Sequence, residues 1–97
     1  MDIDRIAKQL EAHRSALSRD LGVERLLVFG SVVRGTGRED SDIDILVDFD
    51  GPATFDRYFE LKERLEKLLG RSVDLVTRNA LRPAMRPVIE REAVRVA

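Results

Sequence analysis

The chain has 97 residues, of which 43% are apolar and 36% charged, and its 17 basic and 18 acidic side chains give a formal net charge of −1. This length predicts one domain over residues 1–97 with a single modest core and no room for a second, substrate-binding domain. The balanced charge disfavours nucleic acid as a partner, and the absence of cysteine excludes disulfides and thiolate metal sites, which is typical of a reducing cytoplasm.

The N-terminal segment predicts an amphipathic helix from Ile3 to about Asp20, with Gly22 as its stop. His13, the only histidine, lies at the edge of the apolar face, and we expect a packed or rim side chain because no second chemical group stands nearby for catalysis. Neither a secretory signal nor a stretch of about 20 apolar residues is present. We therefore expect a cytoplasmic protein that is not embedded in a membrane.

The next segment predicts a buried strand over Val23 to Phe29, closed by Gly30, and a short helix from Ser31 to about Gly35. Free backbone N–H groups at such a strand-to-helix junction can hold a phosphate, and Gly30 permits its close approach. A Gly-Ser turn without a ligand is the alternative, since such turns are common. Arg34 can reach a phosphate or form an ordinary ion pair.

A polar loop from Gly35 to Ser41 leads into a strictly alternating strand. Its apolar face is predicted to join the core and consists of Ile43, Ile45, Val47 and Phe49. On the other face, Asp42 and Asp44 have Cα atoms roughly 6.6 Å apart, so both carboxylates can reach one cation cluster. Asp48 stands roughly 13 Å beyond Asp44 and is left out. A solvent-exposed strand face is the alternative, but a row of acids without a basic neighbour on that face favours a cation.

The region after this strand predicts a helix that Thr54 caps and Gly70 ends. Its predicted buried side consists of Phe55, Phe59, Leu61, Leu65, Leu68 and Leu69. Its charged side is predicted to carry the surface pairs Glu60–Arg64 and Glu63–Lys67.

The following apolar segment, Val73 to Thr77, predicts a strand that Asp74 interrupts. Taken alone, Asp74 is an ordinary surface aspartate near a strand end, but with Asp42 and Asp44 it completes a three-carboxylate site on adjacent strands.

The C-terminal tail contains Pro87, which is expected to begin a last short helix to about Glu92, and Val94 to Val96 predict a final strand. Its basic side chains are expected to stay solvated, with phosphate screening as the alternative; they are Arg78, Arg82 and Arg86.

Several motifs in this order resemble one family. The chain has Gly30-Ser31, Arg34-Gly35 and Ser41-Asp42-Ile43-Asp44, which together resemble the signature of the DNA polymerase β-like nucleotidyltransferases. Further motifs of the minimal (MNT) branch, the MntA-type antitoxins of HEPN/MNT modules, are matched by Leu68-Leu69-Gly70, Val73-Asp74-Leu75-Val76 and Ile89 with Glu92-Ala93-Val94. The resemblance covers nearly the whole chain.

The order of elements predicts an α/β (α+β) sandwich, and the resemblance implies the polymerase β-like nucleotidyltransferase fold, with a small mixed sheet packed against helices. It also implies magnesium-dependent transfer of AMP from ATP to a protein hydroxyl, a tyrosine of a HEPN toxin. Asp42 and Asp44 would bind two Mg²⁺ ions, and Asp74 would complete the ion beside the acceptor hydroxyl. Gly30 and Ser31 would hold the phosphates together with Arg34.

Two alternatives remain open at this point. One is a non-catalytic antitoxin of the same fold, against which the presence of all three acids argues. The other is nucleotidyl transfer to a small molecule or an RNA end, against which the lack of a second domain argues. Assembly of the chain with copies of itself is also possible.

Overall fold

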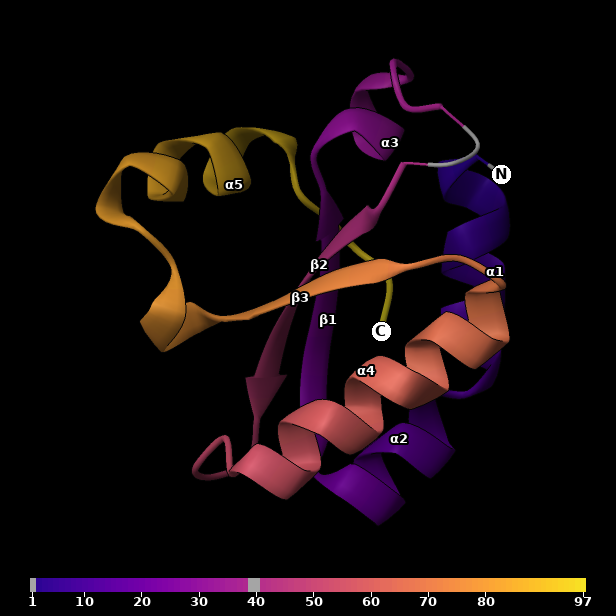
Figure 1. Ribbon diagram of the computed structural model, residues 1–97, viewed down its shortest axis with the longest axis vertical. Helices are drawn as coiled ribbons and strands as arrows, with labels where there is room; N and C mark the ends of the chain where they lie inside the picture. Colours follow the sequence, from indigo (N-terminus) through magenta and orange to yellow (C-terminus); the bar gives the residue numbers. More distant parts are fainter. Residues whose placement is uncertain (1, 39–40) are drawn as a thin grey trace.

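The computed structural model describes residues 2–38 and 41–97, which form a four-stranded sheet with helices on both faces (Figure 1). The strands are β1 (Val23–Phe29), β2 (Ile43–Phe49), β3 (Val73–Thr77) and β4 (Val94–Arg95). The α-helices are α1 (Ile3–Ala12), α2 (Arg14–Leu21), α3 (Ser31–Arg34), α4 (Phe55–Leu69) and α5 (Arg86–Glu92). Two 3-10 turns, η1 (Arg78–Ala80) and η2 (Pro83–Met85), connect β3 to α5. Residues 39 and 40 of the expected polar loop lie outside the described residues.

The sheet is mixed, as the sequence predicts. Its order is β3-β2-β1-β4, and β1 pairs antiparallel with both β2 and β4. The β2 and β3 strands are parallel because α4 carries the chain back to the same end of the sheet. This pairing places Asp44 opposite Asp74, while Phe29 at the end of β1 lies opposite Asp44 on the other side.

The prediction of one N-terminal helix is wrong in one respect. The segment forms two helices, α1 and α2, which are separated at His13. The His13 backbone N–H donates to Leu10 and Glu11 carbonyls, and its ring Nδ1 lies 2.9 Å from the carbonyl oxygen of Gln9. The carbonyls at the end of α1 are thereby satisfied locally, and a new helix can begin in a different direction. The His13 side chain is exposed, which agrees with the rim position predicted for it.

The fourth helix begins and ends where the sequence predicts. The Thr54 hydroxyl accepts a hydrogen bond from the Arg57 N–H, and Gly70 ends the helix in the left-handed conformation. Its surface pairs are present, with 3.3 Å between Arg64 and Glu60 and 3.2 Å between Lys67 and Glu63. The predicted burial of two aromatic residues is wrong: Phe55 is 78% exposed and Phe59 50%, whereas Tyr58 in the same turns of α4 packs against the main core.

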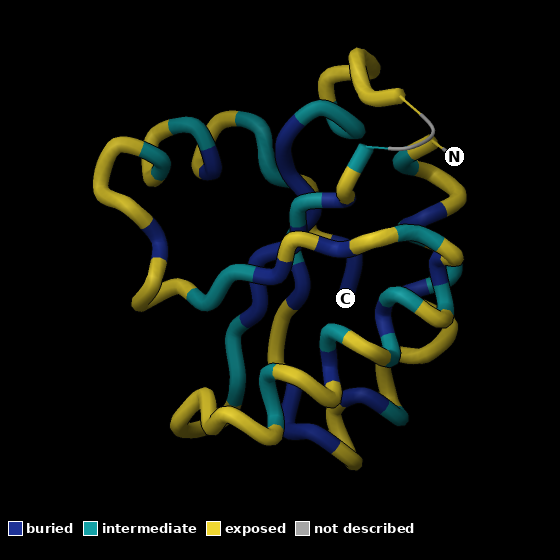
Figure 2. The backbone as a smooth tube through the Cα atoms, in the orientation of Figure 1, coloured by how far each residue is buried: buried dark blue, intermediate teal, exposed yellow. Residues whose placement is uncertain are grey.

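Two separate apolar cores flank the sheet (Figure 2). The larger one joins α1, α2 and α4 to the sheet face that contains Ile43, Ile45 and Val47. On the opposite face, Leu46 is fully buried against Phe29, Leu81 and Ile89. On this acidic face, α5 and the 3-10 turns cover part of the sheet (Figure 1). This second core forms one wall of the site described below.

The C-terminal segment supplies β4, an edge strand of the sheet. Pro87 lies in the first turn of α5, which begins one residue earlier than expected. The predicted last strand is present as β4, and the Val96 N–H and Ala97 carbonyl oxygen continue the pairing with the backbone of Leu26. Within the described residues, no helix has the length and hydrophobicity to cross a bilayer.

Candidate functional site

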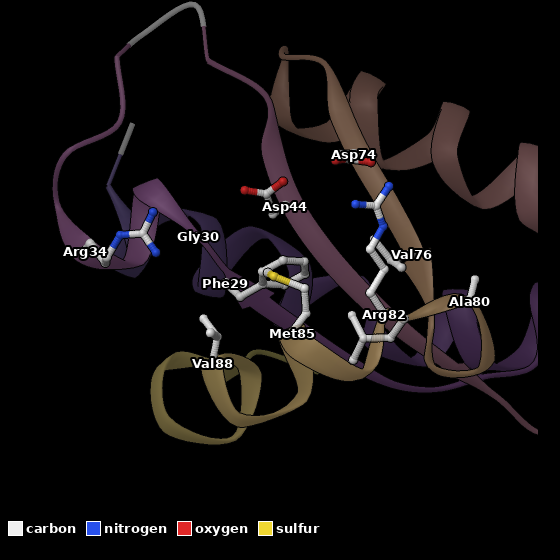
Figure 3. Close-up of a pocket in the computed structure, with 11 residues that line it drawn as sticks. Phe29, Gly30, Arg34, Asp44, Asp74, Val76, Ala80, Arg82, Met85 and Val88 are labelled. Carbon is white, nitrogen blue, oxygen red and sulfur yellow. The ribbon is translucent and has the colours of Figure 1, made fainter.

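A pocket of about 420 Å³ lies between the acidic face of the sheet and the C-terminal segment (Figure 3). Its polar side chains are Arg34, Asp44, Asp74 and Arg82. Its remaining wall is Gly30 together with apolar residues, namely Phe29, Val76, Ala80, Leu81, Met85 and Val88. The pocket therefore combines a charged end with an apolar end, as sites for small organic ligands commonly do.

Two of the three predicted acids meet in this pocket. Asp44 and Asp74 occupy paired positions on the parallel strands β2 and β3, and both line the pocket. Burial raises the pKa of Asp44 to about 6, and the Asp74 charge, the Asp42 charge and a hydrogen bond with Asp74 contribute to this rise. The positive charge of Arg34 partly opposes it. Burial, together with the neighbouring carboxylates, thus disfavours ionisation of Asp44 in the folded protein.

Gly30 is required by the position of Asp44. Its backbone has φ 79° and ψ −153°, a combination that is essentially restricted to glycine. A Cβ atom at this position would overlap Oδ2 of Asp44. The glycine that ends β1 therefore makes room for the carboxylate on the neighbouring strand.

The other predicted phosphate ligands differ in their surroundings. Arg34 lines the pocket, but its Nη1 also donates to Oε2 of Glu92 in α5 at 3.0 Å. Ser31 begins α3, and its carbonyl oxygen accepts the N–H groups of Thr36 and Gly37, which folds the following loop back over it. Ser31 is not among the residues that line the pocket.

Asp42 also stays at the margin of the site. It precedes β2, is exposed and does not line the pocket, although its charge acts on Asp44. Within residues 2–38 and 41–97, no three acidic or histidine side chains converge into a ready-made metal site. The loop that carries Asp42 is fastened by Arg71, whose guanidinium donates to the carbonyl oxygens of Arg38 and Ser41.

Asp48 was left out of the predicted site, and it is not among the residues that line the pocket. Its carboxylate is bound by Arg25 at 3.1 Å and by Arg78 at 2.8 Å, which holds its pKa below the ordinary value. Arg78 was expected to stay solvated and is instead part of this ion pair. Asp48 therefore has a structural partner, whereas the main neighbours of Asp44 are other acids.

The apolar wall and Arg82 are the parts of the pocket that sequence reasoning missed. Leu81, Met85 and Ile89 recur at intervals of four residues, a spacing that points to one covered face. Arg82 follows the buried Leu81, and its side chain extends from η2 toward Asp74 (Figure 3).

The donor chemistry of the pocket fits a divalent metal ion. Carboxylate oxygens are the ligands that Mg²⁺ prefers, and a cation would remove the repulsion that contributes to the raised pKa of Asp44. Asp44 and Asp74 are the residues that would hold such an ion.

Comparison with known proteins identifies the family. Residues 10–96 match the family model described as nucleotidyltransferase domain. The chain belongs to this family. The resemblance recognised from the motifs is therefore confirmed, and the protein is a nucleotidyltransferase.

Relatives of this nucleotidyltransferase include a protein adenylyltransferase MntA of Thermococcus cleftensis, which is 43% identical over 99% of this chain and 97% of its own length. A solved structure of a protein provisionally named a minimal nucleotidyltransferase is 42% identical and superimposes with a TM-score of 0.73, covering 97% of this chain and 95% of that one. A crystal structure of a toxin–antitoxin with AMP-PNP is 26% identical, with a TM-score of 0.71 over 90% of this chain and 72% of that one. The predicted mixed-sheet nucleotidyltransferase fold is confirmed.

Proposed function

We propose that this nucleotidyltransferase transfers AMP from ATP to a hydroxyl group of a protein, and that the acceptor is a tyrosine of a HEPN-type toxin that is silenced by the modification. The observation that carries the proposal is the pair Asp44 and Asp74 at the charged end of a pocket whose other end is apolar. The relatives support this acceptor class, since one is named a protein adenylyltransferase and another is part of a toxin–antitoxin with a bound ATP analogue.

The transfer needs one bond to form and one to break. The acceptor oxygen attacks the α-phosphorus of ATP, the bond from that phosphorus to the bridging oxygen breaks, and pyrophosphate leaves while the hydroxyl proton is released. The protein contributes mainly by positioning and by charge stabilisation. Two Mg²⁺ ions, when bound, would neutralise the phosphate charge and lower the pKa of the acceptor hydroxyl.

Each end of the pocket has its own role in this proposal. Asp44 would hold both ions, Asp42 from the adjoining loop would complete the site of the ion that arrives with the triphosphate, and Asp74 would hold the ion beside the acceptor. The Gly30-Ser31 junction and Arg34 would bind phosphate oxygens. The apolar wall around Met85 would contact the nucleobase and exclude water.

The proposal is tested by calorimetric titration of ATP in the presence of magnesium and, separately, of a chelator. Tight binding is expected only with magnesium, because unneutralised carboxylates repel the triphosphate. Asp44→Asn is expected to lose this magnesium dependence, whereas Glu11→Gln, on the exposed surface of α1, is expected to keep it. Equal affinity of the unaltered protein for ATP in both conditions would refute the metal site.

The acceptor class is tested with α-³²P-labelled ATP and a purified HEPN-type protein from the same genome. Label on a tyrosine of that protein supports the proposal. Tight binding without label would favour the non-catalytic antitoxin, and label only on RNA or on a small molecule would favour the other alternative.

A further inference from the structure

A rigid cluster of aromatic side chains lies on the surface of α4. Phe55 and Phe59, two of the four phenylalanines in the chain, are 78% and 50% exposed. Their ring centres are 4.7 Å apart, and the Tyr58 ring meets Phe59 nearly at a right angle with 5.2 Å between centres. The Tyr58 hydroxyl donates to the Leu75 carbonyl oxygen, which fixes the cluster to β3. The cluster is therefore preorganised for contact, as residues that dominate protein interfaces are.

These side chains form one wall of a groove between α4 and β3, which we call the aromatic groove. It has a volume of about 350 Å³ and is lined, among the described residues, by uncharged side chains only: Ala53, Phe55, Tyr58, Phe59, Leu75, Val76, Thr77 and Ala80. A surface without cations does not fit a phosphodiester backbone. Its chemistry fits apolar side chains of a protein.

The aromatic groove adjoins the acidic pocket. Val76 and Ala80 line both, so the two depressions share one rim formed by the end of β3 and by η1. A protein whose hydroxyl enters the pocket beside Asp74 from the β3 edge would pass over this rim. Its neighbouring side chains would then lie within reach of the groove.

Docking through strand addition is disfavoured at this edge of the sheet. β3 is an edge strand, but the Val73 N–H donates to the Glu66 carboxylate and the Leu75 carbonyl oxygen accepts from Tyr58. Glu66 and Tyr58 of α4 thus already hydrogen-bond to backbone groups of β3 that a partner strand would need. A partner must bind mainly through its own side chains.

We propose that the aromatic groove docks the protein that carries the acceptor hydroxyl, through an apolar segment next to the modified residue. This inference rests on the proposed function and names the surface that selects its substrate. A second copy of the chain is the competing occupant. Because the groove and the pocket share Val76 and Ala80, a copy seated there would cover the rim between them and compete with an acceptor that docks in the groove.

The test measures AMP transfer by Phe55→Ser and Phe59→Ser as a function of the concentration of the HEPN-type protein. Val94→Ser is the matched control, because Val94 is an exposed apolar residue, 39% accessible, on the opposite edge strand. Each phenylalanine variant is expected to raise KM for the acceptor protein at least tenfold, with kcat at saturation and the affinity for magnesium-ATP unchanged. The control is expected to match the unaltered protein.

Three results would overturn the inference. One is an unchanged KM in both phenylalanine variants. Another is a parallel loss of kcat and ATP affinity, which would mean that the pocket itself was damaged. The third is sedimentation showing a dimer of the unaltered protein that Phe55→Ser dissociates.

Failure of the proposed function is recognised separately, by measuring direct binding of the HEPN-type protein without ATP. If the unaltered protein transfers no AMP but binds, and Phe55→Ser weakens that binding tenfold, the groove is a docking surface and only the transfer reaction is refuted. If transfer occurs and binding is insensitive to Phe55 and Phe59, the reaction stands and the docking surface is refuted.

Discussion

Replacing Asp44 with asparagine is expected to stabilise the metal-free protein. The pKa of Asp44 is raised from 3.8 to about 6 by burial and by its acidic neighbours, so its ionised form is less favourable in the folded chain than in the unfolded one. A shift of about two units corresponds to about 3 kcal/mol. Because Asp44 is only half-buried, solvent screening reduces the expected effect to about 1–1.5 kcal/mol. For a domain of this size that is a rise in Tm of about 5–10 °C.

The sign of the effect fixes its pH dependence. The stability associated with protonated Asp44 is fully present below the ordinary pKa of 3.8 and is lost as the pH rises through about 6. The asparagine side chain of the variant would stay neutral at every pH. The two proteins should therefore differ most at about pH 8 and converge near about pH 4.

The assay is urea unfolding in EDTA at several pH values, with Glu11→Gln as the control for removal of one negative charge. Glu11 is exposed on α1, which packs on the other face of the sheet, so this change is expected to be within about 0.5 kcal/mol of neutral. Addition of Mg²⁺ should reverse the order, because only the unaltered protein gains binding energy from the ion. Equal stability of Asp44→Asn and the unaltered protein in EDTA at about pH 8 would refute the argument that Asp44 is under electrostatic repulsion.

Three further changes test the geometry of the site. Gly30→Ala should cost about 3 kcal/mol in unfolding free energy and abolish magnesium-ATP binding, since it combines a glycine-only conformation with a Cβ that overlaps Asp44; thermal unfolding that matches the unaltered protein would contradict this. Asp74→Asn should leave magnesium-ATP affinity within about tenfold, or about 1.4 kcal/mol, while single-turnover transfer falls at least a hundredfold, because Asp74 would hold only the ion beside the acceptor. Transfer by Asp74→Asn at the original rate would remove Asp74 from the mechanism. Asp42→Asn, in contrast, should weaken nucleotide binding and transfer together.

The elements that depend on local chemistry are predictable from the sequence. The strand Val23–Phe29 contains the apolar run Leu26 to Phe29, which ends at a glycine, and both ends of α4 are set by one hydroxyl and one left-handed glycine. Each signal lies within a few residues of the structure it determines, so tertiary contacts need not be known. The break at His13 differs, because the apolar spacing continues through it and the interruption comes from hydrogen bonds that end one helix and allow another to start.

Packing against distant segments could not be predicted in the same way. Phe55 and Phe59 continue the apolar stripe of α4, and periodicity alone assigns them to the core. In the structure, Tyr58 makes the core contact in these turns and leaves both phenylalanines exposed. Leu46 alternates onto the same face of β2 as Asp44, and its burial depends on Leu81 and Ile89 folding back from the tail. Neither outcome is encoded in the spacing of one element.

The arrangement of the three acids depends on strand register as well as on the alternating sequence pattern. Alternation along one strand places Asp42 and Asp44 on the same face, which favours them as a pair. The closest pair across the sheet is instead Asp44 with Asp74, because the parallel register set by α4 makes them neighbours, while Asp42 precedes the first residue of β2. Asp42 is therefore held by the loop that Arg71 fastens rather than by the sheet. The proposed role of Asp42 as a metal ligand thus depends on the conformation of that loop. A change at Arg71 should therefore weaken nucleotide binding, as a change at Asp42 should.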